Sequence, residues 1–95
     1  MKQLVLLGST GSIGTQALDV VRKHGVQVLG LSAYSNVGLM EQQVREFCPR
    51  VACMVQEDAA KDLKERIADT DTRVLSGEDG LCELAAMDDA DMVLN

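Results

Sequence analysis

The chain has few of the residues that stabilise a fold by means other than a packed core. Its 95 residues include no tryptophan, one tyrosine, one phenylalanine and one proline. The three cysteines are odd in number and form no Cys-x-x-Cys pair, so neither a disulfide framework nor a zinc site is expected. We interpret Cys48, Cys53 and Cys82 as small core residues without chemistry of their own.

Long apolar runs and an excess of positive charge are also missing. No run approaches the ~18 residues of a membrane span, and no signal peptide opens the chain. The formal net charge of -6 argues against a nucleic acid or a membrane as partner. With 46% hydrophobic and 25% charged residues, the composition is that of a globular protein. We expect a single cytoplasmic domain.

Short apolar runs alternate with stretches of helical periodicity along the whole chain. Strands are predicted at residues 4–7, 26–33, 51–55 and 92–94, with a weaker candidate at 73–75. These runs are nearly continuous, which is typical of parallel strands buried on both faces. Four helical patterns separate them: one from Ser12 to His24-Gly25, one lined by Val37, Met40, Val44, Phe47 and Cys48 and closed by Pro49, one lined by Ala60, Leu63 and Ile67, and one lined by Leu81, Leu84 and Ala85.

This pattern predicts an α/β fold. We expect an open parallel, Rossmann-type sheet with helices on both faces, in three α/β/α layers. The first strand should be central, with the second and third strands successively outside it, the weak strand at the far edge and residues 92–94 on the other side. Asn95 would then end at the carboxyl edge, which faces the ligand crevice in such sheets. We therefore expect residues 1–95 to be a truncated dinucleotide-binding domain, with the catalytic and C-terminal domains outside them.

A glycine-rich loop follows the first predicted strand and opens the first predicted helix. Gly8, Gly11 and Gly14 recur every three residues, a variant of the dinucleotide-binding fingerprint. The first glycine permits the tight turn, the second lets the backbone approach a pyrophosphate, and the third lets helix and sheet pack closely. Free N–H groups of the first helical turn would bind the anion, and hydroxyls would add donors. The predicted phosphate-binding residues are Gly8, Thr10, Gly11, Ser12, Ile13 and Gly14. The alternative is a turn without a ligand, in which Ser9 or Thr10 caps the helix.

The end of the second predicted strand bears on the choice between NAD and NADP. NAD-binding domains place an Asp or Glu there to hold the ribose 2′-hydroxyl, whereas this chain has Tyr34, Ser35 and Asn36. No carboxylate would repel a 2′-phosphate, and Ser35 and Asn36 stand at the start of a helix, where an anion is stabilised. NADP(H) is therefore favoured, with Tyr34 packed against the adenine. Alternatively, Asn36 only caps the second helix.

The remaining polar residues do not form a catalytic arrangement. Asp88, Asp89 and Asp91 cluster before the last strand, but their spacing does not converge on a cation, and we interpret them as a solvated turn. The sequence has no Tyr-x-x-x-Lys pair and no plausible Ser/His/Asp arrangement. We therefore predict no catalytic and no metal-binding residue within the chain.

Several ordered stretches resemble one known family, the 1-deoxy-D-xylulose 5-phosphate reductoisomerases. The resemblance covers essentially the whole chain and lies in residues 1–4, 7–14, 18–21, 31–37, 74–77 and 90–95. It implies an enzyme of non-mevalonate isoprenoid synthesis that converts 1-deoxy-D-xylulose 5-phosphate to 2-C-methyl-D-erythritol 4-phosphate. It also implies NADPH as cofactor and a divalent cation, Mg²⁺ or Mn²⁺. The metal ligands and the residues that hold the sugar phosphate would lie beyond Asn95, and the complete enzyme would be a homodimer.

The resemblance also implies roles for individual residues. Thr10 to Ile13 would hold the pyrophosphate, and Tyr34, Ser35 and Asn36 would surround the 2′-phosphate. Many members of the family have Gly and then Lys or Arg where this chain has Tyr34 and Ser35, so a cation beside the 2′-phosphate is missing. Two other functions remain open at this point: a semialdehyde dehydrogenase-like enzyme, and a non-catalytic redox sensor that binds NADP and a partner protein.

Overall fold

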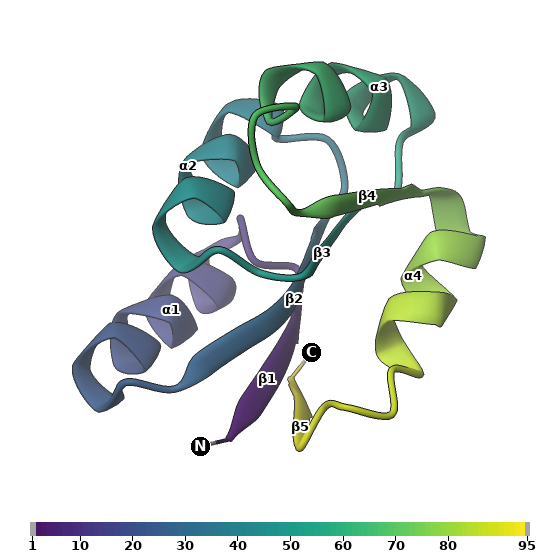
Figure 1. The fold of residues 1–95 in the computed structure, drawn as a ribbon. Helices are drawn as coiled ribbons and strands as arrows, with labels where there is room; N and C mark the ends of the chain where they lie inside the picture. The colour runs from purple at the N-terminus through teal and green to yellow at the C-terminus, as the bar shows by residue number, and fades with distance from the viewer. Residues whose placement is uncertain (1, 95) are drawn as a thin grey trace.

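The structure, a computed structural model, describes residues 2–94. Strands and helices alternate along the chain (Figure 1). In order they are β1 (Gln3–Leu7), α1 (Ser12–His24), β2 (Gln27–Ala33), α2 (Val37–Phe47), β3 (Val51–Met54), α3 (Glu57–Arg66), β4 (Arg73–Ser76), α4 (Gly77–Ala85) and β5 (Met92–Leu94).

The strands form one parallel sheet in the order β4-β3-β2-β1-β5. This confirms the predicted topology, including the weak strand at the far edge and β5 on the other side of β1. β1 is an interior strand between β2 and β5, while β2 is the middle of the five. Because all pairs are parallel, every strand ends at the same edge of the sheet. The loop that follows β1 and the loop that follows β2 are therefore neighbours.

The helices cover the two faces of the sheet unequally. Figure 1 shows α1, α2 and α3 on one side and α4 on the other, which confirms the three-layer arrangement. The larger core contains Leu6, Leu31 and Ala52 from the strands, packed against Leu18, Met40 and Leu63 from the three helices. The smaller core lies under α4 and joins Val5, Leu29 and Cys53 to Leu84. The side chains of one strand thus alternate between the two cores, as the strand pleat requires.

The two helices nearest the predicted site end in left-handed residues. α1 stops at Gly25, where φ is 64°, after a last turn with Arg22, Lys23 and His24. This is the expected glycine stop, with basic residues at the negative end of the helix dipole. α2 stops at Cys48, where φ is 49°, and Pro49 follows it, as the sequence predicts.

The interpretation of the cysteines as core residues is correct for one of the three. Cys53 is buried in β3, whereas Cys48 and Cys82 are exposed, so the prediction is wrong for these two. Cys48 is the left-handed residue at the end of α2, so the helical repeat that would turn its side chain towards the core stops at this residue. Cys82 lies on α4 beside Leu81, which packs on the smaller core, and its own side chain faces away.

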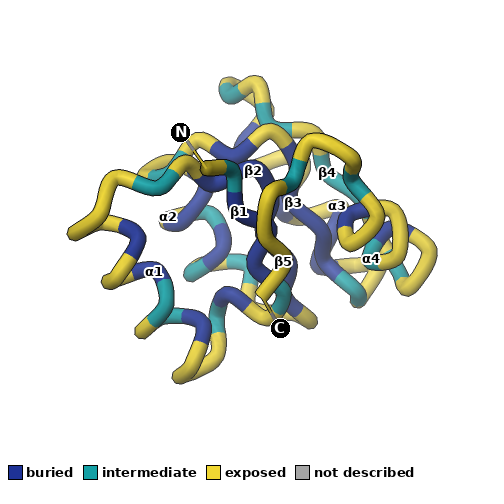
Figure 2. Tube along the Cα trace, turned by 90° about the horizontal axis from the view of Figure 1, so that it is seen from below, coloured by how far each residue is buried: buried dark blue, intermediate teal, exposed yellow. Residues whose placement is uncertain are grey.

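Burial decreases from the centre of the sheet towards β5. Figure 2 shows buried residues along β1, β2 and β3 and exposed ones along β5. Met92, Val93 and Leu94 are 39%, 42% and 39% exposed. Among the described helices, none has the length and the apolar character needed to cross a membrane.

Candidate functional site

The predicted site residues come together at the carboxyl edge of β1 and β2. Leu7 of β1 pairs with Ser32 of β2, so the loop after β1 and the loop after β2 leave the sheet side by side. Each loop leads at once into a helix, α1 or α2. Two helix N-termini, each with partial positive charge, therefore face the same edge.

The three glycines of the loop have different environments. Gly8 has φ +77°, a conformation that glycine adopts without strain, and it turns the chain out of β1. A Cβ on Gly14 would lie 2.8 Å from Ser9 Cα and still closer to the carbonyl oxygen of Gly8, so only glycine lets α1 start this near the loop. A Cβ on Gly11 would meet nothing nearer than Gly8 O at 3.8 Å. The space beside Gly11 is therefore open on the protein side.

The start of α1 is not closed by a side chain. Gly11 occupies the N-cap position and no side-chain hydrogen bond caps the helix. The first helical bonds run from Thr15 N to Gly11 O at 2.9 Å and onwards, which leaves the N–H groups of Ser12, Ile13 and Gly14 ahead of the ladder. The alternative in which Ser9 or Thr10 caps α1 is wrong. These N–H groups are donors suited to an anion.

The loop residues divide into inward-facing and outward-facing ones. Ser12 is exposed, Thr10 is half-buried and Ile13 is 79% exposed. Ser9 is fully buried. Leu7, Gly8 and residues 11–14 line a hollow in the surface at this point. All the predicted phosphate-binding residues except Thr10 therefore border a space that a ligand can enter, and Ser9 does not.

Two residues that the sequence analysis did not single out hold the loop in place. Ser32 of β2 accepts hydrogen bonds from Gly8 N, at its Oγ (3.1 Å), and from Ser9 N, at its carbonyl oxygen (2.7 Å). Gln43 of α2 bonds both the hydroxyl and the carbonyl of Ser9. A signal was available for Gln43, because it shares the buried stripe of α2 with Met40 and Val44. A polar residue on an apolar helix face needs a buried partner.

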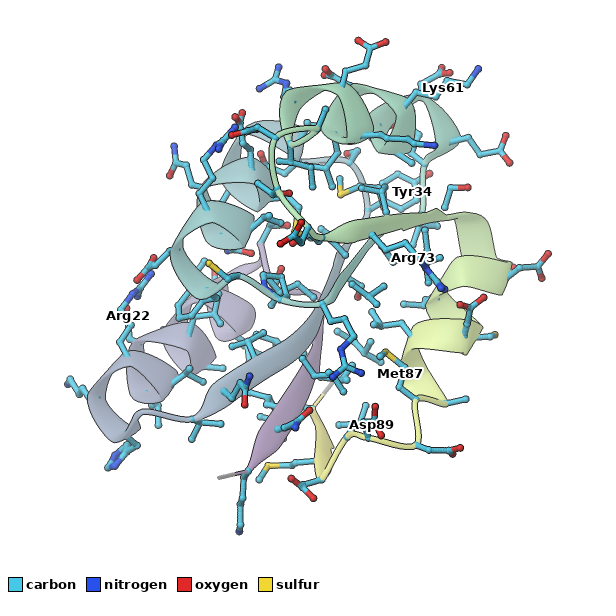
Figure 3. The ribbon with its side chains drawn as sticks, in the orientation of Figure 1. Arg22, Tyr34, Lys61, Arg73, Met87 and Asp89 are labelled. Atoms are coloured by element: carbon cyan, nitrogen blue, oxygen red, sulfur yellow. The ribbon has the colours of Figure 1, made fainter. Side chains whose placement is uncertain are left out.

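The second half of the site is the junction of β2 and α2. Asn36 caps α2, because its Oδ1 accepts a hydrogen bond from Leu39 N at 3.2 Å. The capping role is therefore confirmed, and it uses the side-chain oxygen of Asn36 and not the amide nitrogen. Ser35 and Asn36 are exposed, and Tyr34 is 68% exposed. Tyr34 lies beside the start of α3 (Figure 3), where its carbonyl accepts from Gln56 N at 3.0 Å. The side chains are thus accessible while the backbone beneath them is fixed.

Neither part of the site carries a formal charge. Residues 8–14 and 34–36 include no Lys, Arg, Asp or Glu. An anion bound here would interact with backbone N–H groups, helix dipoles and hydroxyls rather than with a cation. The ion pair between Arg22 of α1 and Glu46 of α2 lies in the last turns of the two helices, at the ends away from the site; Figure 3 shows Arg22 on the outer surface of α1. Hydrogen bonding to Arg22 lowers the pKa of the Glu46 carboxyl.

The acidic residues before β5 make contacts within the fold. Asp91 accepts from Gln3 N at 2.8 Å, and Asp89 pairs with Arg50 at 2.8 Å. Within residues 2–94, no group of three or more His, Cys, Asp or Glu side chains is placed to hold a metal ion.

Comparison with known proteins identifies the family. The family model of 1-deoxy-D-xylulose 5-phosphate reductoisomerase matches residues 4–95. The reductoisomerase of Halothermothrix orenii is 47% identical over 96 residues, a match of 99% of this chain and 25% of that protein. The reductoisomerase of Agathobacter rectalis is 48% identical, with 99% and 25% covered. The chain thus spans about a quarter of the length of the curated relatives it matches.

Solved structures agree with the sequence comparison. A DOX-P reductoisomerase in complex with NADPH, fosmidomycin and magnesium superimposes with a TM-score of 0.93 at 33% identity, covering 98% of this chain and 24% of that one. The enzyme of Zymomonas mobilis in complex with NADPH gives a TM-score of 0.86 at 31% identity, covering 90% and 23%. By family model, relatives and fold, this chain belongs to the 1-deoxy-D-xylulose 5-phosphate reductoisomerase family.

Proposed function

We propose that residues 1–95 are the NADP(H)-binding domain of a 1-deoxy-D-xylulose 5-phosphate reductoisomerase. The observation that carries the proposal is a pair of features at one edge of the sheet. α1 starts directly after the glycine loop without a side-chain cap, and the neighbouring β2–α2 junction has no acidic residue. Family membership favours this function over a semialdehyde dehydrogenase or a redox sensor. The complete enzyme, meaning the longer protein that we propose contains this chain, would convert 1-deoxy-D-xylulose 5-phosphate to 2-C-methyl-D-erythritol 4-phosphate.

The pyrophosphate would bind at the start of α1. The N–H groups from Thr10 to Gly14 and the hydroxyls of Thr10 and Ser12 would donate to its oxygens. The open space beside Gly11 fits a pyrophosphate that approaches the backbone closely. A charged acceptor strengthens each of these hydrogen bonds, and the dipole of α1 adds to the attraction.

The adenosine half would bind at the start of α2. The Ser35 hydroxyl and the Asn36 amide nitrogen would donate to the 2′-phosphate, because the Asn36 oxygen is already bonded to Leu39 N. The exposed ring of Tyr34 would stack on the adenine. The lack of a carboxylate lets the phosphate approach without charge repulsion.

The bound cofactor would supply the hydride for the reduction. The described residues bind and orient it, and Ile13, exposed at the rim of the hollow, would shield the cofactor from water on that side. The Mg²⁺ or Mn²⁺ ligands and the sugar-phosphate contacts would come from outside residues 1–95, since the described part offers no cluster of metal ligands. We further propose a cytoplasmic homodimer as the complete enzyme.

Gly11→Val tests the proposal in the complete enzyme. Gly11 has φ -77° and ψ 173°, which valine adopts readily, and its Cβ would meet no protein atom closer than 3.8 Å. The unliganded fold should therefore be unchanged, while the valine side chain would occupy the space of the pyrophosphate. We expect the KM for NADPH to rise at least about a hundredfold, which corresponds to the loss of two hydrogen bonds to a charged group. An unchanged KM for NADPH would refute the assignment of this loop.

A further inference from the structure

The buried residue of the glycine loop, Ser9, is bonded at every polar group. Its N–H donates to Ser32 O at 2.7 Å, its hydroxyl donates to Gln43 Oε1 at 2.6 Å, and its carbonyl accepts from Gln43 Nε2 at 2.9 Å. Ser9 is 0% exposed and Gln43 is 4% exposed. The Ser9 hydroxyl is therefore not available to a phosphate, and the Ser9–Gln43 pair acts inside the protein.

The bond to the Ser9 carbonyl determines where the next N–H points. The carbonyl of Ser9 and the N–H of Thr10 belong to the same peptide group, and no peptide bond of the described chain is cis. In a trans peptide these two groups point in opposite directions. Because Gln43 Nε2 holds the carbonyl towards α2, the Thr10 N–H points in the opposite direction, away from Gln43.

The orientation of the Gln43 side chain is itself determined. A carbonyl oxygen can only accept a hydrogen bond, so the amide nitrogen of Gln43 must face Ser9 O and its oxygen must face the Ser9 hydroxyl. Met40 and Val44, one turn before and one residue after, are both buried, and they leave the amide little room to move. Asn36 caps the same helix, so α2 supports both halves of the site.

We propose that Gln43 is a positioning residue for cofactor binding: it aims the Thr10 N–H at the pyrophosphate by holding the Ser9 carbonyl. This inference rests on the proposed function, because it requires a pyrophosphate at the loop. It distinguishes the two bonds of the Ser9–Gln43 pair. The carbonyl bond sets the binding geometry, whereas the hydroxyl bond contributes to stability alone.

The test is the Kd for NADPH of the complete enzyme, of Gly11→Val and of three further variants, each measured together with the thermal midpoint. Gln43→Met removes both bonds at similar side-chain volume, and we expect its Kd to rise about tenfold to a hundredfold, as for the loss of one hydrogen bond to a charged acceptor. Ser9→Ala removes only the hydroxyl bond, and we expect a change in Kd below about threefold. Val44→Ala, a buried neighbour on α2, is the control for lost packing: its thermal midpoint should fall while its Kd stays at the wild-type value.

The outcomes separate this inference from the proposed function. If wild type and Gly11→Val bind NADPH equally, the proposed function fails and the inference fails with it. If Gly11→Val loses binding but Gln43→Met binds as tightly as wild type, or if Ser9→Ala loses as much as Gln43→Met, the inference alone is overturned. Amide hydrogen exchange of the wild type needs no variant: NADPH should slow exchange at Thr10, and unchanged exchange there would contradict the proposal.

Discussion

Replacement of Gly14 by alanine tests whether the third glycine is required by packing. The added Cβ would lie 2.8 Å from Ser9 Cα and 2.9 Å from Ser9 C, both backbone atoms. Neither can rotate away, so α1 must shift relative to the loop. Overpacking typically costs ~1–3 kcal/mol, and a clash with backbone belongs at the upper end, about 3 kcal/mol. Alanine regains ~1 kcal/mol of helix propensity over glycine, which leaves a net loss of about 2 kcal/mol.

Urea denaturation of the chain, followed by circular dichroism, measures this loss. With a slope of roughly 2 kcal/mol per molar urea, Gly14→Ala should lower the midpoint by about 1 M. Gly11→Ala is the matched control, because its Cβ would meet no atom nearer than 3.8 Å, and its midpoint should stay within about 0.3 M of wild type. The reasoning is refuted if the two variants unfold at the same urea concentration.

Three further predictions concern cofactor choice, thiol reactivity and pH. Ser35→Asp should lower the NADPH/NADH ratio of kcat/KM at least about tenfold, because the carboxylate repels the 2′-phosphate of NADPH and accepts a hydrogen bond from the ribose 2′-hydroxyl of NADH. Ser35→Arg should raise this ratio, and the increase should shrink with added salt. A constant ratio in both variants would place the 2′-phosphate elsewhere. A thiol reagent should label exposed Cys48 and Cys82 in the folded protein and Cys53 only after unfolding, because burial raises the pKa of the Cys53 thiol; rapid labelling of Cys53 would contradict this. Arg22 lowers the pKa of Glu46, so this pair stabilises the fold at pH values above the ordinary carboxyl pKa of 4.5 and loses its contribution as the pH falls through the lowered pKa. The thermal midpoint of Glu46→Gln should therefore depend less steeply on pH than that of the wild type. An identical pH dependence would rule out a contribution of the pair.

Periodicity and turn chemistry in the sequence were enough to predict the fold. The continuous apolar run of β2 identified a strand buried on both faces, and the structure buries Val28 to Ala33. Gly25 and Pro49 marked the ends of α1 and α2 because each has a local backbone effect that does not depend on the rest of the chain. Right-handed crossovers then determined the strand order. These features are local or nearly universal, which is why the sequence sufficed.

Contacts between distant residues were harder to foresee. The Ser9–Gln43 pair joins residues 34 positions apart, and nothing in the periodicity of α2 identifies the partner of a buried glutamine. Cys48 was misplaced because helical spacing continues its apolar stripe, whereas the left-handed turn at that residue ends it. The alternative cap of α1 fails for the same reason: Ser9 is a residue type that caps helices, but its hydroxyl donates to Gln43 of α2 instead.

The structure of the complete enzyme with bound NADPH tests the central claim most directly. The account predicts pyrophosphate oxygens within hydrogen-bonding distance of the N–H groups of Thr10 to Gly14, and the 2′-phosphate beside the Ser35 hydroxyl and the Asn36 amide nitrogen. It also predicts that the hydrogen bond from Gln43 Nε2 to Ser9 O keeps its length of 2.9 Å. A pyrophosphate bound away from the start of α1, or a 2′-phosphate distant from Ser35, would contradict it.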